Sequence, residues 1–138
     1  MGFGAAMTDT SAYNAMVWMN NATRQAYFEA LWGKTGLGLT LGRVTLNSAD
    51  FSFESFNYDP EANDFALAKF DHTLAYDHQR VVPMIKEAMR TAANAWGDEI
   101  KLFASPWSPP CVSLLCPAQC APLSVLRPLV CMVALLLN

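Results

Sequence analysis

The stretch Gly2-Phe3-Gly4-Ala5-Ala6-Met7-Thr8-Asp9 opens the 138-residue chain and decides which fold the sequence can form. Its small residues let other backbones approach closely, and Phe3 and Met7 add apolar bulk, so the stretch predicts a short buried strand. Asp9 stands where this strand gives way to a helix. In a parallel α/β sheet or barrel this is the carboxyl edge, where ligands bind. The pattern alone favours the other role of such a residue, a helix N-cap.

The next hundred residues alternate between helical and strand patterns. Apolar spacing predicts helices over residues 12–19, 21–32 and 76–96, and further strands over 37–46 and 100–104. The order β-α-β-α-β implies parallel strands joined by right-handed crossovers. A closed (β/α)8 barrel takes about 250 residues, so this chain holds about three of the eight βα units.

Three features of this pattern leave alternatives open. Arg43 interrupts the second strand, where it either has a partner near an active site or sits at the strand end and reaches solvent. Pro83 either begins the main part of the third helix or kinks it. The long polar segment 47–73 carries several aromatic side chains, which could stack on sugar rings but are more simply explained as holding the loop in place.

Charge divides the chain into two parts. All twelve acidic and eight of the nine basic residues precede position 111. Segment 111–138 contains a single charged residue, Arg127, and all four cysteines of the chain. We expect a partial barrel domain over 1–110 and a separate apolar Cys/Pro/Leu-rich tail. Three prolines and Arg127 interrupt the tail, so a membrane anchor is less favoured than translation in a wrong frame or through an intron.

Three stretches together resemble the glucosylceramidases of glycoside hydrolase family 30. They are residues 2–9, the segment from Gly36-Leu37-Gly38 through Arg43-Val44 to Asp50-Phe51-Ser52, and Leu102-Phe103-Ala104-Ser105-Pro106-Trp107-Ser108-Pro109. The likeness extends over residues 2–110. It implies an α/β fold, an incomplete (β/α)8 TIM barrel made of about the first three βα units.

The resemblance also implies a function, the retaining hydrolysis of the β-glucosyl bond of glucosylceramide or a related β-glucoside. It assigns Asp9 to hydrogen bonds with the sugar hydroxyls, Trp107 to the wall of the same pocket, and Arg43 to a place close by. Without the resemblance, core packing is an equal alternative for Trp107. The two catalytic glutamates of the family lie at later strands, one of them in an Asn-Glu-Pro motif. This sequence has no Asn-Glu-Pro, so we expect no catalytic residue in it and an inactive isolated chain.

Several partners and cofactors are excluded or left open by the sequence. The net charge of −3, without a Lys/Arg cluster, argues against nucleic acid. Neither Gly2-Phe3-Gly4 nor Gly36-Leu37-Gly38 continues into the Gly-x-Gly-x-x-Gly motif of dinucleotide-binding proteins. The spacing of the histidines and cysteines is poor for metal binding, so no cofactor or metal is expected. No signal peptide opens the chain, although the family is lysosomal or secreted. A lipid membrane surface is a possible partner. The alternative to the glycosidase function is that the chain is a non-catalytic or membrane-tethered fragment.

Overall fold

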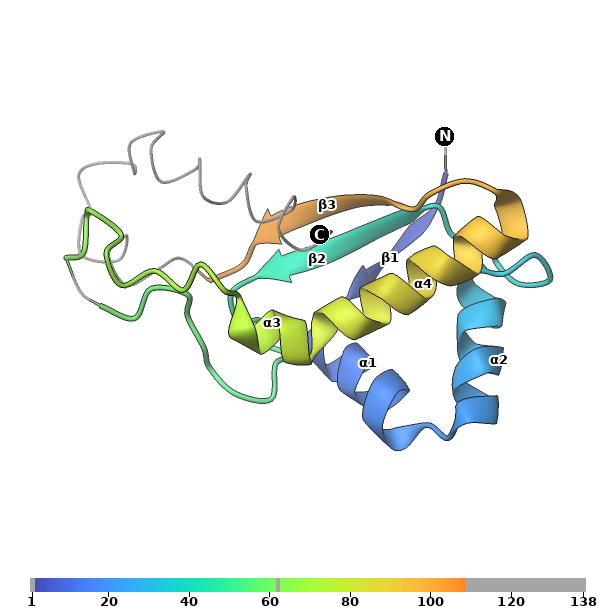
Figure 1. Cartoon of the computed structure of the whole chain (residues 1–138), viewed down its shortest axis with the longest axis horizontal. Helices are drawn as coiled ribbons and strands as arrows, with labels where there is room; N and C mark the ends of the chain where they lie inside the picture. The colour runs from blue at the N-terminus through green and yellow to red at the C-terminus, as the bar shows by residue number, and fades with distance from the viewer. Residues whose placement is uncertain (1, 62, 109–138) are drawn as a thin grey trace.

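The computed structural model describes residues 2–61 and 63–108, which form a three-stranded parallel sheet with a helical layer (Figure 1). The strands are β1 (Gly4–Met7), β2 (Leu41–Leu46) and β3 (Lys101–Pro106), hydrogen-bonded in the order β1-β2-β3. The helices are α1 (Asp9–Tyr13), the π-helical turn η1 (Asn14–Trp18), α2 (Asn21–Trp32), α3 (Ala75–Gln79) and α4 (Val81–Trp96). Parallel neighbours need long crossovers, and both crossovers here contain helices. The α/β class and the arrangement of an incomplete α/β barrel are confirmed.

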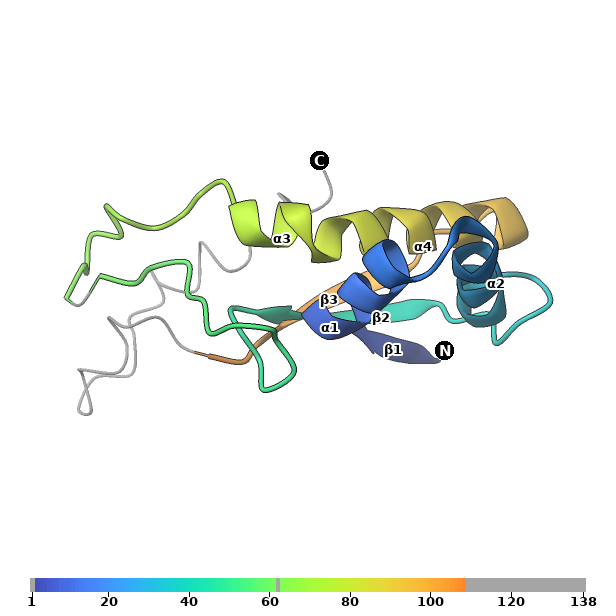
Figure 2. The same cartoon turned by 90° about the horizontal axis from the view of Figure 1, so that it is seen from below.

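The core lies between the sheet and the helices, which all sit on one side of it (Figure 2). Val44 and Leu46 of β2 are buried in this core, together with Phe28 and Trp32 of α2 and Ile85 of α4. The aromatic rings of Phe28 and Trp32 stack with their centroids 5.4 Å apart, as their i, i+4 spacing predicts. Burial of each such large side chain contributes about 1.5–3 kcal/mol, so this layer holds the sheet and helices together.

The second strand begins later than its apolar pattern predicts. Residues 37–40 lie outside β2, because their backbone turns back onto α2: the Leu37 amide donates to the Ala30 carbonyl at 2.8 Å, and the Leu39 amide to the Leu31 carbonyl at 2.9 Å. Gly38 supports this turn with a φ of +61°, a region that favours glycine. The strand prediction was therefore wrong for its first four residues.

Two of the three predicted helices are interrupted. The helix expected over 12–19 begins at Asp9, changes to the π-helical turn after Tyr13 and ends at Trp18. The helix expected over 76–96 is divided at Arg80, whose φ of −116° separates α3 from α4. Pro83 is the third residue of α4, and its missing N–H costs nothing in the first turn. The alternative in which Pro83 begins the helix is therefore wrong, because α4 begins at Val81.

The structure tests the predicted helix over 21–32 but not the predicted tail. The helix over 21–32 is confirmed, and Gly33 and Gly97 are the C-cap residues of α2 and α4. The tail 111–138, with its cysteines and the membrane-anchor alternative, lies outside the described residues. Within the described part of the chain, no helix is long and apolar enough to cross a membrane.

Candidate functional site

The carboxyl ends of the three strands meet at one edge of the sheet, from which the loop after β2 extends (Figure 1). Asp9 follows β1 by two positions, Asn47 follows β2 directly and Trp107 follows β3 directly. Trp107 continues the sheet pairing, because its amide donates to the Leu46 carbonyl at 3.2 Å. The edge where ligands bind in parallel α/β folds therefore carries two of the residues that the sequence singled out.

Asp9 is buried at this edge and does not cap a helix. Thr8 is the N-cap of α1, and its side chain accepts from the Ser11 amide, so the N-cap prediction for Asp9 was wrong. Only 3% of Asp9 is exposed. Its Oδ2 accepts from the Phe53 amide at 3.2 Å and from the Tyr76 hydroxyl at 2.7 Å, whereas Oδ1 is buried and has no hydrogen-bond partner among the described residues. This oxygen is an unpartnered hydrogen-bond acceptor that is shielded from solvent in the described structure.

Arg43 and Trp107 are in direct contact. The Arg43 guanidinium carbon lies 4.9 Å from the centroid of the Trp107 ring, a cation–π distance. Trp107 is 37% exposed, so its indole is not a core side chain, and the core-packing alternative was wrong. Its ring also lies 5.8 Å from the ring of Phe51. The indole thus presents a partly open apolar wall beside a positive charge.

Arg43 occupies the middle of β2, on the sheet face that the described helices do not cover. In the strand register it stands between Ala6 of β1 and Phe103 of β3, and Phe103 is 53% exposed. The interpretation of Arg43 as a strand-end residue was wrong, and its observed partner is the Trp107 ring. A hollow of about 340 Å³ on this face is lined by Gly4, Ala5, Ala6, Leu41, Arg43 and Phe103.

One loop segment links Asp9 to the Arg43–Trp107 pair. The Phe53 amide donates to Asp9, and the carbonyl of Phe51, whose ring faces Trp107, accepts from the Thr10 hydroxyl. Loop 51–53 therefore lies between the residue after β1 and the residue after β3. The structure brings the three sequence-predicted residues to one side of the molecule, two in contact and the third joined through this loop.

A second buried network supports the same edge. The Asn47 side chain donates to the Ser108 carbonyl at 2.7 Å and accepts from the Tyr58 amide at 2.9 Å, and the Tyr58 hydroxyl donates to Asp77 of α3. Burial raises the pKa of Asp77 to about 6, with a further contribution from the negative charge of Asp9. Burial and the neighbouring Asp77 also raise the pKa of Tyr58, so its hydroxyl remains a donor.

Sequence reasoning missed the groups that hold Asp9. Tyr76 and the Phe53 amide are 67 and 44 positions away from Asp9, and no local motif connects them. The one usable signal was the wealth of aromatic residues in the loop. That loop supplies Phe56, whose ring stacks on Tyr76 with centroids 3.8 Å apart.

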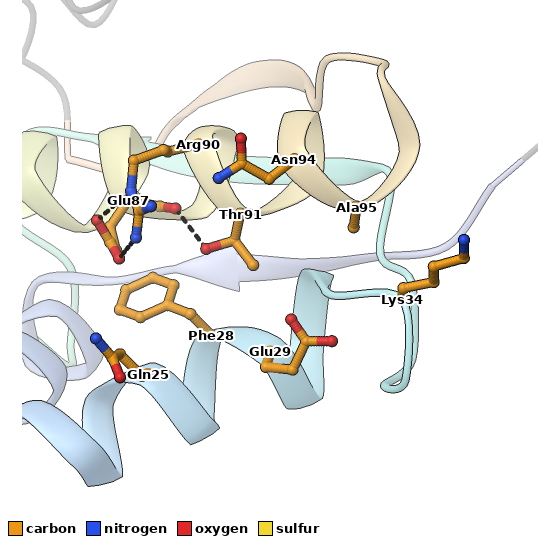
Figure 3. A pocket seen from close by; sticks show the side chains of 9 residues that line it. All are labelled: Gln25, Phe28, Glu29, Lys34, Glu87, Arg90, Thr91, Asn94 and Ala95. Carbon is orange, nitrogen blue, oxygen red and sulfur yellow. Dashed lines mark hydrogen bonds and ion pairs between the residues drawn. The ribbon is translucent and has the colours of Figure 1, made fainter.

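A larger groove lies elsewhere, between α2 and α4 (Figure 3). It measures about 500 Å³ and is lined by Gln25, Phe28, Glu29, Lys34, Glu87, Arg90, Thr91, Asn94 and Ala95. Of its charged residues, Arg90 pairs with Glu87 and the Glu29 carboxylate accepts from the Thr35 amide and hydroxyl. It contains none of the three predicted residues and lies in the helical layer, so it is a surface groove without evident chemistry.

No set of three His, Cys, Asp or Glu side chains with metal-binding geometry occurs in residues 2–61 and 63–108. The chemistry available at the carboxyl edge is therefore that of a hydrogen-bonding carboxylate, an indole face and a guanidinium. A carboxylate beside aromatic faces suits a ligand with hydroxyls on an apolar ring.

The described fold is a segment of an α/β barrel with side chains gathered at its carboxyl edge, and the comparisons give the family. Residues 1–116 match the glycosyl hydrolase family 30 TIM-barrel domain, and the chain belongs to this family. The mouse protein named lysosomal acid glucosylceramidase is 32% identical over 109 residues, which are 79% of this chain and 20% of that protein. A Caenorhabditis elegans protein with the printed name "Putative glucosylceramidase 4" is 40% identical over 110 residues, 80% of this chain and 20% of its own length.

Solved structures agree with the sequence relatives. An endo-β1,6-glucanase superposes with a TM-score of 0.65 at 25% identity, over 79% of this chain and 22% of that chain. SrfJ from Salmonella typhimurium superposes with a TM-score of 0.64 at 27% identity, over 79% and 23% of the two chains. The chain thus spans about a fifth of the length of the curated relatives it matches. The expected family and barrel fold are confirmed.

Proposed function

We propose that this chain forms part of the sugar-binding site of a family 30 glycosidase, with Asp9, Trp107 and Arg43 as substrate-binding residues. The observation that supports this most directly is the buried Asp9 carboxylate at the carboxyl edge, with Oδ2 held by two donors and Oδ1 free. Oδ1 accepts a sugar hydroxyl, the Trp107 indole packs against the apolar face of the ring, and Arg43 orients that indole.

The proposed substrate class is the β-glucosides, with glucosylceramide as its lipid-linked member. The family match and the relatives named glucosylceramidase support this assignment. In such a reaction, two carboxyl groups about 5–5.5 Å apart act as nucleophile and acid/base with retention. For a lipid-linked substrate, the sugar would be presented at a membrane surface and would belong to sphingolipid metabolism.

We further propose that residues 1–138 bind the sugar without hydrolysing it. The five described glutamates support this, because Glu29 and Glu87 lie within helices, Glu54 and Glu61 lie in the loop after β2, and Glu99 precedes β3. None of the five directly follows the carboxyl end of a strand. Incubation with a fluorogenic β-glucoside should give no turnover above the buffer rate, and enzymatic release of the fluorophore by the pure chain would contradict this part of the proposal.

Binding of methyl β-D-glucopyranoside, followed by ¹H–¹⁵N NMR, tests the sugar site. The amides of Phe53 and Trp107 should shift in a saturable way, because they lie at Asp9 and at the indole. Asp9→Asn should weaken binding at least tenfold, since a neutral amide loses a charge-assisted hydrogen bond. Glu87→Gln, in the groove of Figure 3, is the matched control and should bind as the native chain does. Equal binding by the Asp9 and native proteins would refute the proposal.

The alternative function, a non-catalytic or membrane-tethered fragment, has a separate test. Sedimentation with vesicles of phosphatidylcholine, with and without glucosylceramide, distinguishes the two sources of attachment. Binding that needs glucosylceramide and is lost in Asp9→Asn supports the sugar site. Equal binding to both vesicles supports tethering by the membrane itself.

A further inference from the structure

We infer that Tyr76 is a positioning residue for Asp9: its hydroxyl holds Oδ2 and so turns Oδ1 toward the ligand. This inference rests on the proposed sugar site. The Tyr76 hydroxyl donates to Oδ2 at 2.7 Å, and the Phe53 amide donates to the same oxygen at 3.2 Å. Both donors within the described residues therefore act on one oxygen, and the buried Oδ1 is left as the acceptor. A carboxylate without Tyr76 could rotate and present either oxygen.

The ring of Tyr76 makes two contacts that hold it in place. It stacks on Phe56 with an interplanar angle of 20° and a centroid distance of 3.8 Å. The Arg80 guanidinium carbon lies 5.0 Å from its centroid. Two contacts from separate parts of the chain thus fix the direction of the hydroxyl, which a merely space-filling tyrosine would not need.

Helix α3 carries this tyrosine and is itself tied down by the next residue. Asp77 is 3% exposed and accepts from the Tyr58 hydroxyl, and the Tyr58 amide donates to Asn47 at the end of β2. Neighbouring residues of α3 therefore make two tyrosine–carboxylate bonds in opposite senses: Tyr76 donates toward β1, and Asp77 accepts from the loop after β2. The short helix thus links the segment after β1 with the loop after β2.

The hydroxyl of Tyr76 also remains a donor under all ordinary conditions. Burial raises its pKa first, and the hydrogen bond to Asp9 and the charge of that carboxylate raise it further. Loss of the proton would place two negative oxygens together beside Phe53. The Tyr76–Asp9 bond is consequently a fixed part of the site.

The test compares Tyr76→Phe with Tyr13→Phe in the full chain, with methyl β-D-glucopyranoside as the probe. Tyr13 lies in the same cluster, with its ring 4.5 Å from that of Phe53, and the described residues show no hydrogen bond to its hydroxyl. Tyr76→Phe should raise the Kd about fivefold to tenfold, shift the free-state Phe53 amide signal, and lower the melting temperature more than Tyr13→Phe does, because the buried Oδ2 of Asp9 loses one of its two donors. Tyr13→Phe should leave the Kd and the Phe53 signal unchanged.

The outcomes separate this inference from the proposed function. If the native chain binds the sugar and Tyr76→Phe binds equally well, the positioning role is wrong. If the native chain does not bind the sugar, or if Asp9→Asn binds it normally, the proposed sugar site is wrong. In that case the positioning role of Tyr76 is judged by the free protein: an unshifted Phe53 amide signal in Tyr76→Phe would overturn it. Should Tyr76→Phe fail to fold, Phe56→Leu keeps the hydroxyl and removes the stacked ring. It should still raise the Kd at least twofold, and an unchanged Kd would overturn the inference.

Discussion

The two faces of the sheet differ in what they bury, and β2 shows the difference within six residues. Its residues Gly42, Val44 and Leu46 are buried, whereas Leu41 and Arg43, which alternate with them, are only partly buried; on that second face only Thr45, near the strand end, is buried. On the neighbouring strand, Phe103 is more than half exposed beside Arg43. The sheet face that packs against the helices therefore contributes most of the buried core of the described fold. The other face carries side chains that are not needed to hold these strands and helices together.

The largest effect should come from a cavity on the helical face. Ile85 of α4 is fully buried, and Ile85→Ala should reduce the free energy of unfolding by about 2–5 kcal/mol. Phe103→Ala removes a larger side chain from the open face and should cost less than about 1 kcal/mol, because that ring already contacts water. Urea unfolding followed by circular dichroism measures both. Equal losses would show that the open face is also packed.

A buried charge in the helical layer should make stability depend on pH. The folded pKa of Asp77 is about 6, above its ordinary value of 3.8, so the folded state binds a proton more tightly than the unfolded chain. The resulting stabilisation is fully present below about pH 4 and is lost as the pH rises through 6, a change of at most about 3 kcal/mol.

Asp77→Asn isolates this contribution, because the amide oxygen can still accept from Tyr58. The variant should lack the fall in stability between pH 4 and 7 and should be more stable than the native chain at pH 7. Denaturant midpoints at half-unit pH intervals provide the measurement. A slope that persists in the variant would assign the pH dependence to another group.

A smaller effect should follow from added bulk on β2. A Cβ at Gly42 would lie 2.6 Å from the Leu102 Cδ2 and 3.1 Å from the Met7 Cε, which are terminal atoms of flexible side chains and can shift, so Gly42→Ala should cost only about 1 kcal/mol through overpacking. Ala6→Val adds more atoms on the open face of β1, where Ala6 is exposed, and should change stability by less than about 0.5 kcal/mol. Thermal unfolding of the two variants side by side tests the contrast, and a greater loss for Ala6→Val would reverse it.

Much of the fold was predictable because it depends on local patterns. The small-residue stretch located β1, apolar spacing located β3, the helix over 21–32 and most of β2, and the order of elements predicted parallel pairing. The start of β2 was not predictable from the same pattern. Leu39 is buried like a strand residue, but its amide bonds to the Leu31 carbonyl instead of to a neighbouring strand. The break at Arg80 has no glycine or proline at that residue to announce it.

The site was predictable only in part, and mainly through resemblance. Asp9 and Trp107 stand out because they come after strand patterns, Trp107 directly and Asp9 two residues on, and both lie at the carboxyl edge. Their partners are distant in sequence: Tyr76 reaches Asp9 only because α3 is tied to Tyr58, a contact between segments that no periodicity records. Whether Asp9, Trp107 and Arg43 bind a sugar stays a prediction.

The smallest effect on stability should come from Arg43, although its charge lies within the sheet. Its contact with Trp107 is worth about 0.5–1 kcal/mol, and its buried Nε, which has no hydrogen-bond partner in the described part of the chain, opposes that gain. Arg43→Met keeps the length of the side chain and should therefore leave the denaturant midpoint nearly unchanged, while altering the fluorescence of Trp107. A loss above about 2 kcal/mol in the free energy of unfolding would mean that Arg43 stabilises the fold. The two sheet faces would then not differ in their contribution to stability as argued above.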